Sequence, residues 1–315
     1  MLAAYPKQTQ TQEELHPAAV WIDLLNPTED EERLVAAATG LHVPTRAELS
    51  EIETSSRLQR RSGAFILSLP TAPAGQPPSP VGFVLSREHL LTVRFTPLPA
   101  FETYAGTITQ DAPTVGSLEI FLGLQEAITD RMADLLEREA GILETASRRI
   151  FRPAPGSAGR PARVDREMRA LLGEIGSAGD ALSRVRETLL GVARIAPFVA
   201  GNAGDWISAA QRPRFETLRS DIGSLVDYET NLAEKVQFLL DATLGFINIE
   251  QNNIIKVLTV VSIVGIPPTF VASLYGMNFK DIPELNWSFG YWYALALMLV
   301  SAIAPLVWFR LRGWL

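Results

Sequence analysis

The chain has no cysteine, so it can form neither a disulfide framework nor a thiolate metal site. Histidine is scarce too: there are three, at positions 16, 42 and 89, and their scattered placement is typical of ordinary surface or turn residues. Basic residues are outnumbered 28 to 35 by acidic ones, and no basic stripe could follow phosphates. These shortages argue against soft-metal ligation and against a nucleic-acid partner. A phosphate-binding glycine loop and a catalytic constellation are also missing from the sequence, so we expect no enzyme.

Charged residues are missing from two long runs near the end of the chain, residues 257–279 and 285–309. Each run is long enough to cross a bilayer core of roughly 30 Å, which takes about 20 apolar residues as a helix. They predict a membrane hairpin, and the polar sequence before them predicts a body outside the bilayer. Because no apolar stretch follows Met1, no cleaved signal peptide is expected and the body should lie in the cytoplasm.

The charges around the two runs predict their orientation. Lys256 precedes the first run, Arg310 and Arg312 follow the second, and the intervening residues 280–284 carry one basic and two acidic groups. Positive charge collects on the cytoplasmic side, so both termini should be cytoplasmic and the loop external, in an inner-membrane protein that spans the bilayer twice.

The sequence separates into five regions. Residues 1–113 are expected to form an α+β cytoplasmic subdomain, with strands over 19–25, 64–69, 80–85 and 89–95 and a helix that begins after Thr28. Residues 114–205 should form a helical hairpin, with helices over 114–151 and 162–196 and a break from Pro197 to Asp205. Residues 206–279 should form a stalk helix that continues into the first membrane span. An external loop (280–290) and a second span with a short tail (291–315) complete the chain.

The stalk helix has no helix-breaking signal from Arg214 to Ile266. At 1.5 Å per residue these positions would extend about 80 Å, too far for a helix buried in one domain of this size. Such a stalk is most stable when it is bundled with copies of itself.

One face of this helix carries a second pattern, which continues below and above the membrane. Polar or small residues, interrupted by apolar Ile255 and Ile266, recur at alternating spacings of four and three: Asp241, Gly245, Asn248, Asn252, Ile255, Thr259, Ser262, Ile266, Thr269 and Ser273. Taken alone, the part inside the membrane is better explained by close packing of membrane helices. The alternative is a pore, favoured because the pattern extends to Asn278.

The sequence around this pattern resembles the CorA family of divalent-cation channels. Tyr275-Gly276-Met277-Asn278 ends the first of two terminal spans and is followed by Ile282-Pro-Glu-Leu285. Residues 238–258 and the segment Trp21-Ile-Asp-Leu-Leu-Asn-Pro-Thr28 also resemble the enterobacterial-type magnesium transporters. The likeness extends over about residues 18–315 and is most specific in the last 80. Two departures are Ile282, where relatives often have Met, and an end without the lysine cluster that many carry.

The resemblance implies a homopentameric channel in which five first spans line one pore. Gly276, Met277 and Asn278 would then form the ion entry, and Thr269 the next polar ring. The apolar constriction would comprise Ile266, Leu258 and Ile255, with Asn252 and Asp241 at the inner exit and Ser262 among the lining residues. Closure by cytoplasmic Mg²⁺ is implied as well, and Asp221 and Asp227, with Glu229 and Glu234 nearby, are the candidate regulatory ligands.

The chemistry of the pattern suits Mg²⁺ as the substrate. Mg²⁺ gives up its water reluctantly, and neutral amide oxygens can accept hydrogen bonds from its water shell. A ring of carboxylates would hold the ion too tightly for conduction. Glu284 in the loop either attracts cations or has a structural role. No cofactor is expected, and Co²⁺ and Ni²⁺ are candidate secondary ions.

Two alternatives remain open at this point. A ZntB-type zinc transporter is disfavoured because those proteins usually have a β-branched residue at the position of Met277. A membrane-anchored cation sensor that oligomerises without conducting would have the same two spans.

Overall fold

The computed structural model describes residues 1–5, 19–71, 78–108, 115–151, 161–278 and 283–313. Two compact units are present. Unit 1 comprises Met1–Pro155 and Ala170–Leu240, and unit 2 comprises Gly156–Arg169 and Asp241–Leu315.

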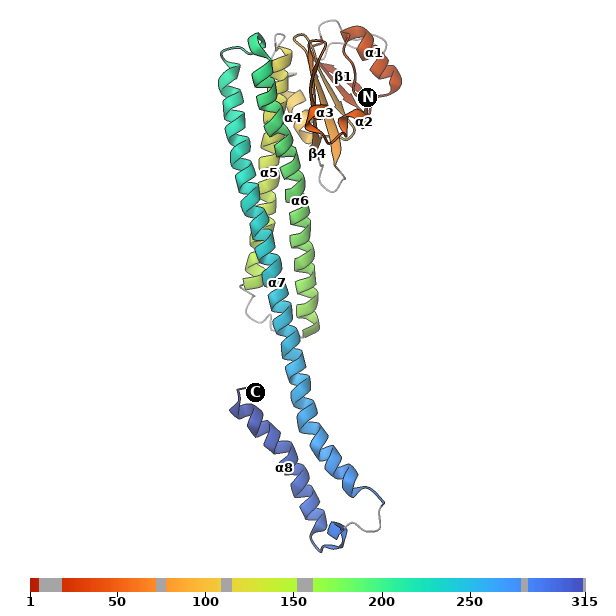
Figure 1. Ribbon diagram of the computed structural model, residues 1–315, viewed down its shortest axis with the longest axis vertical. Helices are drawn as coiled ribbons and strands as arrows, with labels where there is room; N and C mark the ends of the chain where they lie inside the picture. Colours follow the sequence, from red (N-terminus) through yellow and green to blue (C-terminus); the bar gives the residue numbers. More distant parts are fainter. Residues whose placement is uncertain (6–18, 72–77, 109–114, 152–160, 279–282, 314–315) are drawn as a thin grey trace. The chain divides into compact units, whose positions relative to one another are not determined.

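Unit 1 contains a six-stranded sheet in the order β1-β2-β6-β5-β4-β3 (Figure 1). Its strands are β1 (Leu2–Tyr5), β2 (Trp21–Leu25), β3 (Leu58–Arg61), β4 (Ala64–Thr71), β5 (Ser79–Leu85) and β6 (Leu90–Arg94). The pair β2–β6 is parallel, and the other neighbours are antiparallel. The four predicted strands are confirmed. The two edge strands were not predicted, because their four residues each have little β-branched or aromatic character.

A polar network crosses the two parallel strands inside the core. Arg94 donates from Nε and Nη2 to the carboxylate of Asp23 at 2.9–3.1 Å, and both side chains are buried. The Thr92 hydroxyl donates to Asp23 Oδ1 at 2.7 Å and accepts from Trp21 Nε1 at 2.9 Å. Because an unpaired buried charge is costly, the Asp23–Arg94 pairing holds the register of β2 against β6.

Helices cover both faces of the sheet. On one side lie α1 (Glu29–Thr39) and α2 (Arg46–Leu49), and α3 (Thr54–Arg57) precedes β3. The predicted helix after Thr28 is confirmed: the Thr28 hydroxyl accepts from the Glu31 amide, and the Glu31 carboxylate accepts from the Thr28 amide. The four acidic residues of its first turn favour the positive end of the helix dipole.

The other face packs against α4 (Pro99–Ile108), α5 (Ser117–Phe151), α6 (Pro161–Asn202) and the first turns of α7 (Gln211–Tyr275). Phe83 of β5 meets Phe121 of α5 edge-on at 5.7 Å between ring centroids. The break predicted at Pro197 is wrong, since α6 continues to Asn202 and is followed by the 3-10 turn η1 (Gly204–Trp206). A proline this near a helix end removes one hydrogen bond, and the burial of Ile195, Ala196 and Val199 offsets that loss.

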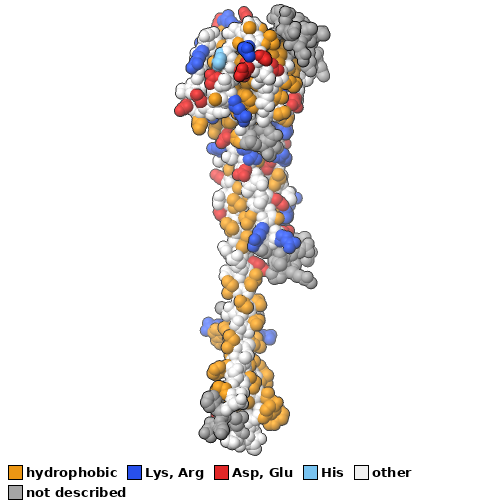
Figure 2. Space-filling view, turned by 90° about the vertical axis from the view of Figure 1, so that its right-hand side faces the viewer, with side chains coloured by type: hydrophobic (Ala, Val, Ile, Leu, Met, Phe, Trp, Pro, Cys, Tyr) orange, Lys and Arg blue, Asp and Glu red, His pale blue; other side chains and the backbone are white. Residues whose placement is uncertain are grey.

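Unit 2 contains the rest of α7, the 3-10 turn η2 (Pro283–Asn286) and α8 (Gly290–Leu311), which runs back antiparallel to α7 (Figure 1). Both α7 and α8 are long and apolar enough to cross a membrane. The second span begins later than its apolar run, because residues 283–286 form η2. Prolines 267 and 268 lie inside α7 without ending it. On the face drawn in Figure 2, charged side chains gather over unit 1 and hydrophobic ones over unit 2.

Candidate functional site

The patterned face of α7 is open to the surroundings in the single chain. Its apolar members Ile255 and Ile266 keep 60% and 65% of their accessible surface, and Leu258, one turn after Ile255, keeps 65%. Asp241, Asn252 and Thr269 are also exposed, and Ser262 is half-buried. Apolar side chains this open require cover, either from lipid or from copies of the same helix.

Two hydroxyl groups on this face are oriented by the helix itself. Thr259 Oγ1 donates to the Ile255 carbonyl and Thr269 Oγ1 donates to the Gly265 carbonyl, both at 2.8 Å. Each hydroxyl hydrogen is therefore occupied inside the helix. The oxygen lone pairs point outward and can accept hydrogen bonds from water around a cation.

The helix α7 ends where the Gly-Met-Asn tripeptide begins. The Gly276 amide donates to the Ala272 carbonyl at 2.9 Å, and the Met277 amide makes a weaker contact with the Leu274 carbonyl at 3.4 Å. Asn278 follows the helix, is exposed, and its side-chain amide makes no hydrogen bond to the part of the chain that the structure describes. The last carbonyls of a helix carry partial negative charge, so Asn278 stands at an end that attracts cations.

Glu284 lies in a tight turn between the two membrane helices. Its carbonyl accepts from the Trp287 amide at 3.3 Å, and a Cβ on Gly290 would lie 2.3 Å from the same oxygen. Gly290 is thus required for the close approach of η2 to the start of α8. Trp287 contacts both Phe289 and Tyr293, with ring centroids 5.3 and 5.6 Å apart. The backbone of Glu284 therefore has a structural role, while its half-buried carboxylate makes no ion pair with the described residues.

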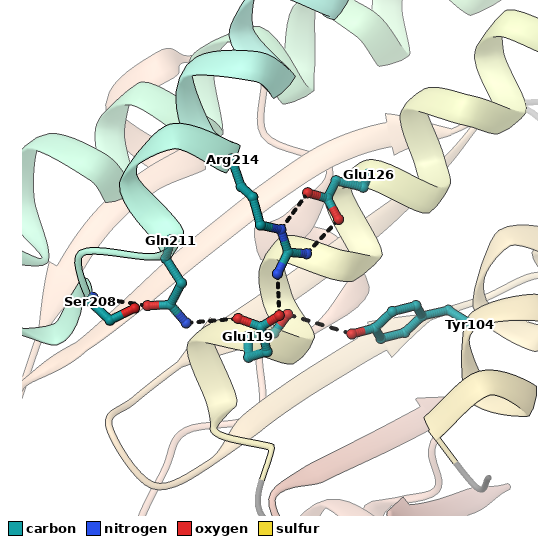
Figure 3. A network of polar contacts seen from close by, with 6 residues as sticks. All are labelled: Tyr104, Glu119, Glu126, Ser208, Gln211 and Arg214. Atoms are coloured by element: carbon teal, nitrogen blue, oxygen red, sulfur yellow. Dashed lines mark hydrogen bonds and ion pairs between the residues drawn. The ribbon is translucent and has the colours of Figure 1, made fainter. Parts of the chain in front are cut away.

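A polar network in unit 1 fastens the first turn of α7 to α5 (Figure 3). Arg214 donates to both carboxylate oxygens of Glu126, at 2.9 and 2.6 Å, and also to Glu119. Gln211 Nε2 donates to Glu119 Oε2 at 2.9 Å, and the Tyr104 hydroxyl donates to the Glu119 carbonyl at 3.5 Å. This network was not predicted from the sequence. The sequence feature that could have indicated it is the spacing of Glu119 and Glu126, which lie seven residues apart on one face of α5.

The network shifts the titration of its members. Burial raises the pKa of Tyr104 to about 12, and the nearby Glu119 charge adds to that rise. Burial also acts to raise the pKa of Glu119, but hydrogen bonds from Gln211 and Arg214 outweigh it and lower that pKa. Hydrogen bonds to Glu126 raise the pKa of Arg214, against the effect of burial. At neutral pH the Glu119 carboxylate and the Arg214 guanidinium are therefore charged, and the Tyr104 phenol is neutral.

Of the four candidate regulatory carboxylates, only Glu229 lies in an environment that differs from the expected one. Asp221 and Asp227 are exposed, as the prediction requires. Glu229, counted among the nearby carboxylates, is buried and paired with Arg186, so it is not open to a metal. Burial raises the pKa of Asp130 on α5, and the charges of Glu126, Asp134 and Asp221 raise it further. Among the described residues no group of three or more His, Asp or Glu side chains is placed to hold a metal ion.

Comparisons with known proteins agree along almost the whole chain. The family model described as CorA-like Mg²⁺ transporter protein matches residues 17–311. The magnesium transport protein CorA of Yersinia pseudotuberculosis is 37% identical over 303 residues, which is 95% of this chain and 92% of that protein.

Two solved structures show the same fold. The complete CorA magnesium transporter of Methanocaldococcus jannaschii matches with a TM-score of 0.76 at 21% identity, over 94% of this chain and 91% of that one. The ZntB cytoplasmic domain of Vibrio parahaemolyticus matches with a TM-score of 0.55 at 12% identity, over 76% of this chain and 92% of that one.

Proposed function

This chain belongs to the CorA-like Mg²⁺ transporter family, whose members carry divalent cations across membranes, and we propose that it is a channel that passes hydrated Mg²⁺ through the inner membrane. The observation that carries the proposal is the exposed polar and apolar pattern of α7, which ends at Asn278 beside the negative end of the helix. A hydrated ion would meet the Asn278 amide first, then the Thr269 hydroxyl. It would next pass the apolar positions Ile266, Leu258 and Ile255.

The pore would require several copies of α7. Five copies arranged around one axis would turn each exposed residue of the pattern into a ring and would remove Ile255, Leu258 and Ile266 from lipid. The second helix, α8, would then face the bilayer, which agrees with its uniformly apolar composition. Both termini would lie in the cytoplasm, so that ions move inward down the membrane potential.

The ligand atoms favour Mg²⁺ among divalent ions. The pattern offers amide and hydroxyl oxygens, and neither cysteine nor histidine occurs in the two spans. Co²⁺ and Ni²⁺ are proposed as secondary ions. The ZntB-type fold in the cytoplasmic region does not separate Mg²⁺ from Zn²⁺, because one fold serves several functions.

The decisive experiment is ion uptake into proteoliposomes that contain the purified full chain, with Mg²⁺ and Zn²⁺ supplied separately. We expect Mg²⁺ uptake driven by an inside-negative potential, and its loss in Asn278→Ala while the oligomer stays assembled. Asn231→Ala, which removes an exposed amide from the unit 1 part of α7, is the matched control and should transport normally. Uptake of Zn²⁺ alone would identify a zinc transporter, and no uptake of either ion would leave the sensor function. Normal Mg²⁺ flux in Asn278→Ala would refute the ion-entry role.

A further inference from the structure

Unit 1 contains a cavity of about 430 Å³ that the transport function does not use. It lies between α6, the end of β4 with the start of β5, and the segment that joins α2 to α3. The residues lining it are Leu49, Ser50, Ile52, Arg57, Pro70, Pro78, Ser79, Pro80, Glu187, Leu190 and Arg194. Its volume falls in the range of small-molecule sites, about 300–1,000 Å³.

The cavity has a rigid side, formed where α6 approaches β4. A Cβ on Gly191 would lie 2.7 Å from the Cβ of Leu69, so this position requires glycine for the helix to come so close. Thr188 Oγ1 donates to the Pro70 carbonyl at 3.0 Å and ties the same turn of α6 to the end of β4. The α6 residues that face the cavity are therefore held in place by contacts with the sheet.

Two arginines meet at this cavity without acidic partners. Arg57 is half-buried, and its Nε donates to the Glu51 carbonyl at 2.7 Å, which orients the guanidinium. Neither Arg57 nor Arg194 forms an ion pair with any carboxylate that the structure describes. Glu187 also lines the cavity, but it lies two helical turns, roughly 10 Å, before Arg194 on α6. The end of the cavity near the arginines is therefore positive and the end near Glu187 is negative.

Buried hydroxyl groups without partners lie beside the arginines. Ser79 lines the cavity, keeps 3% of its surface exposed, and its Oγ has no hydrogen-bond partner among the described residues. Ser68 keeps 4% of its surface exposed, and its Oγ also has no hydrogen-bond partner among the described residues. It lines a small adjoining cavity together with Arg57 and Arg194. A buried hydroxyl without a partner is unfavourable, and a bound acceptor would supply the missing hydrogen bond.

We propose that this cavity binds a small organic phosphate. The phosphoryl group would accept hydrogen bonds from Arg57 and Arg194, since guanidinium groups match phosphate oxygens in geometry and charge. The hydroxyls of Ser68 and Ser79 would donate to the same ligand. Glu187 would accept from hydroxyl groups of its organic part, and the apolar side chains of Ile52 and Leu190 would cover the remainder. The 82% exposure of Ile52, the highest among the cavity's large apolar residues, is explained if a ligand covers it.

Isothermal titration calorimetry on the detergent-solubilised full chain, in magnesium-free buffer, tests this proposal with AMP and inorganic phosphate as probes. We expect AMP to bind, and Arg57→Gln/Arg194→Gln to weaken its affinity by about tenfold or more, because each lost charge-assisted hydrogen bond is worth about 1.5–3 kcal/mol. Arg219→Gln, which removes an exposed arginine of α7 outside the cavity, is the control and should bind as the wild type does. No heat of binding at millimolar AMP, or equal affinity in the double variant, would overturn the proposal.

Two further variants test the assigned ends of the ligand without touching the arginines. Glu187→Gln should strengthen the binding of inorganic phosphate, because it removes a negative charge from the cavity. Ile52→Ser should weaken the binding of AMP and leave the binding of inorganic phosphate unchanged. If the variant weakens the binding of both probes equally, or of neither, the apolar contact with the ligand is contradicted. Circular dichroism of each variant verifies that unit 1 is folded. Ion flux is not a readout here, so failure of this proposal and failure of the transport proposal are distinguishable.

Discussion

At the scale of single residues, the proposed ion path is built from neutral oxygen atoms. The Thr269 hydroxyl donates its hydrogen to the Gly265 carbonyl, so only the lone pairs of its oxygen are available to water around an ion. Asn278 offers an amide just past the last turn of α7. Neutral acceptors bind the water shell of Mg²⁺ weakly enough for release, whereas carboxylates at the same positions would hold the ion. Deeper in the path the side chains are apolar, and there the barrier to ions is dehydration.

The first prediction concerns that apolar barrier. Leu258→Asp should hydrate the narrow segment and raise resting Mg²⁺ leak in proteoliposomes, because a charged side chain draws water into a hydrophobic constriction. Leu258→Met conserves the volume and apolar character of the side chain and should behave as the wild type. Currents from Leu258→Asp that match the control would mean that this face of α7 serves packing rather than conduction.

The second prediction concerns Tyr104 in the network at the start of α7. Its raised pKa means that the folded protein holds the phenol proton more tightly than the unfolded chain does. This contribution to the free energy of unfolding is complete below the ordinary tyrosine pKa of about 10 and is lost as the pH rises from there through about 12. The loss should be on the order of 2 kcal/mol. In Tyr104→Phe this part of the alkaline destabilisation should vanish, as urea unfolding at neutral and alkaline pH would reveal; an unchanged pH dependence would contradict it.

At the scale of elements, the helices of unit 1 depend on a few close approaches. Gly123 of α5 faces the Tyr104 side chain of α4, and a Cβ there would lie 2.2 Å from the phenol oxygen and 2.4 Å from two ring carbons. The absence of a side chain lets α4 and α5 lie together and brings Tyr104 to Glu119. The same helix contains Gly141, where an added Cβ would have no neighbouring atom within 4 Å.

These two glycines of α5 provide a matched pair for the third prediction. Gly141→Ala should stabilise unit 1 by up to about 1 kcal/mol, because alanine favours the helix and fills open space. Gly123→Ala gains the same helix preference but forces Tyr104 to move, and overpacking of this kind costs about 1–3 kcal/mol. Thermal unfolding followed by circular dichroism compares them. Equal shifts of the midpoint would show that Tyr104 adjusts freely and that the close approach is unimportant.

At the scale of the whole molecule, the two units have different surfaces and different tasks. Unit 2 exposes apolar side chains along α7 and α8, as a membrane part must. Unit 1 carries most of the charge and the carboxylates of Asp130, Asp134 and Asp221, which repel one another enough to raise the pKa of Asp130 beyond the effect of its burial. In an oligomer these groups repeat, and a divalent ion that binds among them would relieve the repulsion and favour one arrangement of subunits.

The fourth prediction follows for regulation by cytoplasmic Mg²⁺. If Asp221 and Asp227 contribute to such sites, the double variant Asp221→Asn/Asp227→Asn should close only at a roughly fivefold higher internal Mg²⁺ concentration. A fivefold change is at the lower end of typical allosteric effects on affinity. Asp180→Asn/Glu216→Gln removes two exposed acidic charges from α6 and α7 and is the control. Flux measured against internal Mg²⁺ compares them, and identical inhibition curves would place the sensor on other residues.

The sequence by itself determined the features that depend on neighbouring residues. Short apolar runs predicted four strands, Thr28 before four acidic residues predicted a helix start, and uncharged runs predicted two spans. Each depends on local periodicity or on total hydrophobicity, which are independent of the rest of the fold. The first span was predicted to reach residue 279, but α7 ends at Tyr275, because an uncharged run marks hydrophobicity and not the last hydrogen-bonded turn.

Only the tertiary structure decided what depends on distant partners. Pro197 was expected to end a helix, but burial of its neighbours against the sheet carries α6 onward. Glu229 was expected among free carboxylates, but it is buried and Arg186 of another helix pairs with it. The edge strands β1 and β3 exist because β2 and β4 offer them hydrogen bonds. The proposed phosphate-binding cavity is lined by both Arg57 and Arg194, which are 137 positions apart in the sequence. Packing and charge pairing act through space, so their outcome follows from the folded chain and not from local pattern.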